Sequence, residues 1–320
     1  MKQVKTLKEK QLNVFLSQLG EKAQLFDVRE SVLPPKRYFF PSQEITFTFN
    51  KKSKEVKTAK TSKNFILFGI SLKDLEAITY LDEIMQKPVK DNFYFNKRDK
   101  SILIGLTGKE FGVAPGGDII LRRLESDEYE VVVVTKKGEK LLKNLDFPLK
   151  EKDRVEYEIS KSKTMVELHE LLSDPELLHD AVKWSWQGYS KIWDRLAGEC
   201  LNCGICTYVC PLCHCFSVED SVDLSGDECR RCRKWDACTL PEFAKVSGGV
   251  GRPGHSFHNG VKERYYNWFY HKFVRGYLEF GKSQCVTCGR CKKYCPAKID
   301  IEEVLVDIVK KYKKIKRTQE

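Results

Sequence analysis

Two runs of four cysteines with identical spacing constrain this chain most strongly. Each follows C-x2-C-x2-C-x3-C-P, as CLNCGICTYVCP at 200–211 and CVTCGRCKKYCP at 285–296. A cubane cluster needs four soft thiolates around one small site, and closely spaced cysteines on a tight turn can supply three of them. In two-cluster ferredoxins the fourth cysteine of each run binds the other cluster. The two runs therefore predict two [4Fe-4S] clusters with crossed ligand sets.

The crossed sets assign eight cysteines. The first cluster is expected to take Cys200, Cys203, Cys206 and Cys295, and the second Cys285, Cys288, Cys291 and Cys210. Gly204 and Gly289 occupy the same place in each run, where the backbone must approach inorganic sulfide without a side chain. Structural zinc favours two separated pairs of ligands, so these runs match it poorly.

Five further cysteines lie between the two runs, namely Cys213, Cys215, Cys229, Cys232 and Cys238. A C-x2-C pair with a third cysteine nearby is compatible with a third cluster or a zinc ion. Free cysteine also behaves as a small buried hydrophobe. A third metal site and plain buried thiols therefore both stay open for these five.

All thirteen cysteines lie between Cys200 and Cys295. Intracellular thiols are kept reduced, so this distribution indicates a metal-binding C-terminal half and not a disulfide scaffold. We expect an α+β chain of three parts. They are an α/β docking domain without cysteines at 1–150, a helical connection at 151–196 and a dicluster ferredoxin domain at 197–320.

Local patterns in the N-terminal part mix helical and strand periodicity. Helices are expected over 5–20 and 72–86, and a hairpin over 118–135. Strands are expected at RYFF, EITFTF, NFILFGI, NFYFN and SILIGL.

The C-terminal part is predicted to be mainly helical. Pro175 is expected to open a helix capped by Ser173 or Asp174. The segments between the cysteine runs are expected to be helical, with the aromatic-basic stretch 261–280 exposing Lys262, Arg264 and Lys272. The last helix is expected from Ile301 to about residue 312.

The composition argues against several classes of function. The formal net charge is +11, which two clusters with four thiolates each would lower to about +7. The basic residues are matched by 45 acidic ones, so we expect no nucleic-acid partner. No apolar run is long enough to cross a bilayer, and the N-terminus lacks a secretory signal, so a cytoplasmic location is expected.

No residues indicate a catalytic centre of the chain's own. The run Gly249 to Gly254 fits G-x-G-x-x-G, but no expected strand precedes it, as dinucleotide binding requires. His255 and His258 beside it are expected to be solvated turn residues. The chain alone is therefore expected not to be an enzyme.

Nearly the whole chain resembles the β (iron–sulfur) subunit of cytosolic NAD(P)-linked [NiFe] sulfhydrogenases, a family related to an iron–sulfur subunit of anaerobic sulfite reductase. The matching stretches include PPKRYFF, FILFGISLKDLEAITYLD, CGICTYVCPLCHCF, RKWDAC, VSGGVGRPG and CVTCGRCKKYCPAKIDI. The long separation of the runs also resembles the α-helical ferredoxin domains of succinate dehydrogenase and heterodisulfide-reductase-like proteins. The resemblance implies an electron-transfer subunit between a flavoprotein subunit, which binds FAD and NAD(P)H, and subunits that carry a catalytic metal.

Other assignments stay open beside the hydrogenase. They are the related iron–sulfur subunit of anaerobic sulfite reductase, an electron relay of a heterodisulfide-reductase-like complex, a zinc-binding scaffold protein and a nucleic-acid-binding iron–sulfur protein. The relatives carry cysteines at the positions of Lys73 and Gly108, so any metal site built there should be missing from this chain.

Overall fold

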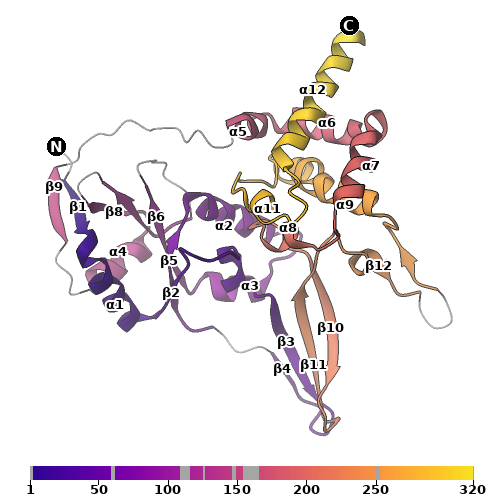
Figure 1. Cartoon of the computed structure of the whole chain (residues 1–320). Helices are drawn as coiled ribbons and strands as arrows, with labels where there is room; N and C mark the ends of the chain where they lie inside the picture. The colour runs from indigo at the N-terminus through magenta and orange to yellow at the C-terminus, as the bar shows by residue number, and fades with distance from the viewer. Residues whose placement is uncertain are drawn as a thin grey trace. The chain divides into compact units, whose positions relative to one another are not determined.

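The computed structural model describes residues 3–58, 62–108, 116–124, 127–145, 149–153, 166–248 and 253–319 (Figure 1). The chain forms two compact units. The first comprises Met1–Phe40 and Ala59–Ser162, and the second comprises Pro41–Thr58 and Lys163–Glu320.

A seven-stranded sheet organises the first unit, in the order β2-β5-β6-β7-β8-β1-β9. Its strands are β1 (Gln3–Lys8), β2 (Gln24–Asp27), β5 (Phe65–Ile70), β6 (Ser101–Thr107), β7 (Ile119–Arg123), β8 (Glu128–Val133) and β9 (Lys150–Asp153). The neighbours from β2 to β7 are parallel, and the remaining pairs are antiparallel. Parallel strands need a crossover connection, and α2 (Leu72–Ile84) and α3 (Asn92–Arg98) lie between β5 and β6 in the chain.

Helices cover both faces of this sheet. Helix α1 (Leu12–Lys22) and helix α4 (Lys136–Lys143) share a buried core with Ile66, Phe68 and Ile104. The next residue of β6, Gly105, points to the opposite face because side chains alternate along a strand. A Cβ at Gly105 would lie 2.8 Å from Cδ1 of Leu75 in α2. Glycine therefore lets α2 approach that face closely.

The second unit contains a four-stranded antiparallel sheet in the order β10-β11-β3-β4. Its strands are β3 (Gln43–Asn50), β4 (Val56–Thr58), β10 (Phe216–Val222) and β11 (Glu228–Trp235), and Figure 1 shows them as two hairpins side by side. Arg233 Nε donates to Glu44 Oε1 at 3.0 Å across the β3–β11 ladder. Residues 41–58 thus complete a sheet with a segment far away in the sequence.

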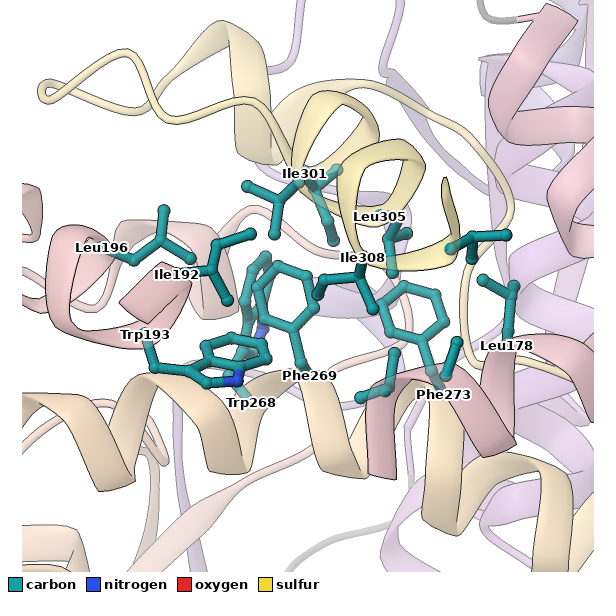
Figure 2. Packing of buried hydrophobic residues seen from close by; sticks show 14 of the residues in the cluster. Leu178, Ile192, Trp193, Leu196, Trp268, Phe269, Phe273, Ile301, Leu305 and Ile308 are labelled. Carbon is teal, nitrogen blue, oxygen red and sulfur yellow. The ribbon is translucent and has the colours of Figure 1, made fainter. Parts of the chain in front are cut away.

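Helices build the core of the second unit. They are α5 (Val166–Leu172), α6 (Pro175–Gly188), α7 (Ser190–Glu199), α9 (Val261–Phe269), the π-helical turn η4 (Tyr270–Arg275), α10 (Gly276–Phe280) and α12 (Ile301–Gln319). Figure 2 shows Trp193, Phe269, Phe273, Leu305 and Ile308 converging from three regions of this helical framework, and all five are almost completely buried. The cysteine runs pack against this core.

Short elements complete both units. The short 3-10 turns are η1 (Glu9–Gln11), η2 (Pro35–Tyr38) and η3 (Glu242–Ala244), and β12 (Lys245–Val246) pairs with β13 (His255–Ser256). Two further one-turn helices, α8 (Ile205–Tyr208) and α11 (Arg290–Lys293), lie inside the two cysteine runs.

Several expectations from the sequence are confirmed. The helix expected at 72–86 is α2, and the hairpin expected at 118–135 is the antiparallel pair β7–β8. Pro175 opens α6, and the Asp174 side chain accepts a hydrogen bond from the Leu177 amide at 2.9 Å. The N-terminal unit mixes helix and sheet as expected.

Other local expectations are wrong, because tertiary pairing and capping override short patterns. The helix expected over 5–20 begins at Leu12, since residues before it pair with β8. The segment NFYFN lies in helix α3. Asp91 caps the N-terminus of this helix, because its side chain accepts a hydrogen bond from the Tyr94 amide at 2.9 Å. RYFF is not a strand but overlaps the 3-10 turn η2.

The C-terminal part also differs from its prediction in three places. The stretch between the cysteine runs contains the hairpin β10–β11, which the ladder with β3 stabilises. The last helix continues to Gln319. The segment expected as a helical connection contributes Leu178 and Trp193 to the core of the second unit.

Candidate metal centre

The two cysteine runs adopt the same backbone conformation. Asn202 and Thr287 have φ of 53° and 54°, and two residues later Gly204 and Gly289 have φ of 72° and 70°. Each glycine immediately precedes a one-turn helix, α8 or α11. Glycine enters this left-handed region without the penalty that a Cβ brings. The sequence repeat is therefore also a structural repeat.

The first cavity lies at the loop of the first run. Among the residues that line it are Cys200, Cys203, Cys206, Cys291 and Cys295. Tyr265, Trp268 and Ile299 contribute apolar walls. Three cysteines of the first run thus meet the last cysteine of the second run here.

The second cavity repeats this arrangement with the runs exchanged. Its lining includes Cys285, Cys288, Cys291 and Cys210. Leu212, Val286 and Ile301 supply its apolar wall. Cys291 borders both cavities, so the two lie next to each other. This grouping is the one that crossed ligand sets require, and the ligand assignment itself stays a prediction.

The donor set of the two cavities fits iron–sulfur clusters. Four or more thiols line each of two adjacent cavities. Within the described ranges, no group of three or more His, Cys, Asp or Glu side chains is arranged to hold one metal ion. Soft thiolates are also the donors that iron–sulfur clusters use.

Burial controls the protonation of these thiols. It raises the pKa of Cys206 to about 12 and that of Cys288 to about 11. The pKa of Cys291 is also raised well above its usual value, by burial and then by the Cys285 thiolate. Several adjacent buried thiolates are stable only with a compensating positive charge, which a bound metal core supplies.

Lys272 places one such positive charge in the protein itself. Its ammonium donates to Cys210 Sγ at 3.2 Å and to the Gln284 carbonyl at 3.2 Å. Burial, the largest influence, acts to lower the pKa of Lys272. The neighbouring thiolates, led by those of Cys210 and Cys213, outweigh it and raise the pKa well above its usual value. The residue lies in the π-helical turn η4, a distortion that is frequent at functional sites.

Arg264 ties the first cysteine loop to its surroundings. Its guanidinium donates to the Asn259 carbonyl at 2.9 Å, to the Thr239 carbonyl at 3.2 Å and to Asn202 Oδ1 at 3.3 Å. The local pattern predicts exposed side chains for Arg264 and Lys272, but they are only 5% and 4% exposed. Their four-residue spacing with Trp268 is the signal in the sequence that indicates burial, because it places all three near one face of the helix.

The five remaining cysteines separate into two groups. Cys213, Cys215 and Cys238 line a third cavity of about 230 Å³, together with His214 and His271. Cys229 and Cys232 do not line it; they lie on β11, opposite Val222 and Glu219 of β10.

The described residues around the glycine-rich run and its neighbouring histidines form no functional site. Residues 249–252 of the glycine-rich run lie outside the described residues. His255 forms part of the short strand β13 and is exposed, as is Phe257 nearby. Over the described part of the chain, no helix combines the length and the apolar character needed to span a membrane.

Comparison with known proteins gives two matches. Residues 199–299 match the family model described as a 4Fe-4S dicluster domain. The chain is also 29% identical over 298 residues to sulfhydrogenase 2 subunit beta of Pyrococcus furiosus, covering 88% of this chain and 84% of that protein. These matches confirm the resemblance to iron–sulfur β subunits of sulfhydrogenases.

Proposed function

We propose that this chain is an electron-transfer subunit that relays electrons through two [4Fe-4S] clusters. It would connect an NAD(P)H-linked flavoprotein to a catalytic metal subunit, in a complex of the cytosolic [NiFe] sulfhydrogenase type. The observation that carries the proposal is the pair of adjacent cavities, which share Cys291 and at each of which three cysteines of one run meet the last cysteine of the other. When bound, such clusters exchange single electrons reversibly.

The chain's own residues would hold and insulate the clusters. Cys200, Cys203, Cys206 and Cys295 would bind the first, and Cys285, Cys288, Cys291 and Cys210 the second. Tyr265, Trp268 and Leu212 exclude water on the core side. Cys203 is exposed, so the first cavity has an edge at which a partner could exchange electrons. The fixed charge of Lys272 would favour the reduced form of the second cluster.

The relative over most of the chain favours a sulfhydrogenase over the other assignments. The iron–sulfur subunit of anaerobic sulfite reductase and a heterodisulfide-reductase-like relay share the cluster chemistry and differ in partners. A zinc scaffold is disfavoured because the thiols surround cavities and do not form compact ion sites in the described part of the chain. In this proposal the chain has no catalytic residue of its own.

Metal analysis tests the proposal directly. The full chain is purified without oxygen, and iron, acid-labile sulfide and zinc are measured. At least about eight irons per chain, with matching sulfide and two magnetically interacting clusters in the EPR spectrum of the reduced protein, are expected. Zinc without sulfide would overturn the proposal.

Partner capture then tests the assignment to a complex. A tagged chain is expected to co-purify, from its native cells, with a flavoprotein and a nickel-containing subunit. Capture of a sirohaem-containing partner would instead support the sulfite reductase assignment. A matched pull-down with Cys288→Ser separates partner binding from cluster integrity.

A further inference from the structure

The β10–β11 hairpin holds together two of the chain segments that line the third cavity of the second unit, and residues of α9, η4 and α10 contribute to the lining. Phe216 at the start of β10 pairs with Trp235 at the end of β11. One residue beyond this pair, the Asp236 amide donates to the Cys215 carbonyl at 3.0 Å. The register of the hairpin thus fixes Cys215 beside the segment that carries Cys238.

The three cysteines of this cavity lie close together. Cys238 is only 2% exposed, and its thiol forms a hydrogen bond with Cys215. Cys206, Cys213 and Cys215 pack against the buried cluster that includes Cys238. Cys206 belongs to the first cysteine run, so this group lies near the first cavity. Lys272 lines both this cavity and the second one.

We propose that Cys213, Cys215 and Cys238 hold a third iron–sulfur cluster in this cavity, beside the two clusters of the cysteine runs. This inference rests on the proposed function, because the new cluster would extend the same electron relay. Three cysteines suit a core of three irons, or of four irons with one bound by another group. His214 and His271 line the cavity and can serve as that group. His214 Nδ1 lies 3.0 Å from the Leu212 carbonyl, which places the ring proton on Nδ1 and the lone pair on Nε2.

The lining has the donors of a cluster, and the cavity of about 230 Å³ has room for a core of several atoms. Three cysteines and a histidine could also bind zinc. The three cysteines lie within residues 199–299, which match a 4Fe-4S dicluster domain, and this favours iron and sulfide over zinc. Lys272 lines the cavity as a cation and would offset part of the negative charge of a third thiolate-bound core, whereas Arg275 in the same lining is paired with Glu279 at 2.6 Å.

The test is a count of iron and sulfide in the full chain, purified without oxygen. We expect about eleven or twelve irons per wild-type chain and a loss of three or four in Cys238→Ser, with sulfide falling in parallel. Cys215→Ser provides a second variant. The double variant Cys229→Ser/Cys232→Ser is the matched control, and it should keep the wild-type count because neither residue lines the cavity.

Each outcome decides the inference. About eight irons in the wild type, with both clusters of the runs intact by EPR, would overturn the third cluster and leave the proposed function standing. Absence of iron would overturn both. About one zinc per chain that disappears in Cys238→Ser would also sink the inference. If Cys238→Ser and Cys215→Ser fail to fold, the double variant Cys229→Ser/Cys232→Ser decides. An unchanged count of eleven or twelve irons in that variant leaves only Cys213, Cys215 and Cys238 as cysteine ligands of the third cluster. A loss of iron in that variant contradicts the proposed site.

Discussion

The Lys272 ammonium lies 3.2 Å from the sulfur of Cys210, inside the helical core that carries both cysteine runs. The lysine is only 4% exposed, and its ammonium also lies 5.4 Å from the centre of the Trp268 ring. A buried ammonium is costly unless it is paired. A cluster bound at Cys210 would therefore lie within the field of this charge.

Replacing Lys272 by Met should make the second cluster harder to reduce. Loss of one unit charge beside a ligand removes a few kcal/mol of stabilisation of the reduced form at an effective dielectric of about 20. We expect the potential to fall by on the order of 100–150 mV, because the couple transfers one electron. An EPR-monitored redox titration of the purified chain measures this.

Two controls accompany this titration. Lys272→Arg keeps the charge, so its potential should differ from the wild-type potential by no more than roughly a third of the shift expected for Lys272→Met. Lys262→Met removes a lysine that pairs with Asp194 at 2.6 Å and lines neither cluster cavity, so it should leave the potential unchanged. Equal potentials in Lys272→Met and the wild type would refute the electrostatic role.

Substitution of Gly204 by Ala should destabilise the first cysteine loop. Gly204 has φ of +72°, and a new Cβ would lie 3.0 Å from the Tyr208 ring and 3.2 Å from the Ala237 Cβ. The left-handed conformation alone costs a residue with a Cβ about 1–2 kcal/mol. We expect the thermal midpoint of the anaerobic protein to fall by several degrees, by about 2–4 °C for each kcal/mol.

Gly198 is the matched control for this substitution. It lies in α7, and a Cβ there would have nothing within 4 Å. Gly198→Ala should therefore be neutral or stabilise by up to about 1 kcal/mol, because alanine favours the helix. A Gly204→Ala protein as stable as Gly198→Ala would show that the loop tolerates a side chain.

The two cysteine loops could be predicted from the sequence because the information in the repeat is local. The spacing within 200–211 and 285–296 determines a loop geometry, and the structure repeats that geometry down to the positive φ of Asn202 and Thr287. The grouping of Cys295 with the first run is expected from the pattern of two-cluster ferredoxins, in which the last cysteine of each run binds the other cluster.

The parts that sequence reasoning missed depend on distant partners. The segment 216–235 forms a hairpin whose second strand, β11, pairs with residues 43–50, which lie far away in the chain. The spacing of Lys272 from Trp268 indicates a buried face of the helix, but only the thiolates around the ammonium explain how a charged side chain can be buried there. The grouping of Cys213 and Cys215 with Cys238, rather than with Cys229, likewise follows from the hairpin register.

Leu305→Ala tests the helical core that supports the cysteine loops. Leu305 of α12 is fully buried among aromatic residues that include Phe269 and Phe273 (Figure 2). Removing its side chain should cost about 2–5 kcal/mol and lower the thermal midpoint accordingly. Leu278→Ala is the control, because Leu278 is 64% exposed and should change stability by less than about 0.5 kcal/mol. Similar midpoints for both variants would contradict the packing.

Paired serine substitutions test whether the two ligand sets cross. Cys295 lines the cavity of the first run, and Cys203 lines the same cavity, whereas Cys288 lines the other. Crossed sets predict that Cys203→Ser and Cys295→Ser each remove about four irons, and that their combination removes no more than either alone. Cys288→Ser combined with Cys295→Ser should remove about eight, because each change then disables a different cluster. Uncrossed sets predict the reverse: Cys288→Ser combined with Cys295→Ser would then remove no more iron than either change alone.

Iron and sulfide counts on anaerobically purified variants distinguish the two patterns. Cys229→Ser is the control, and a near-wild-type iron count in this variant would show that the losses are specific to the cavities.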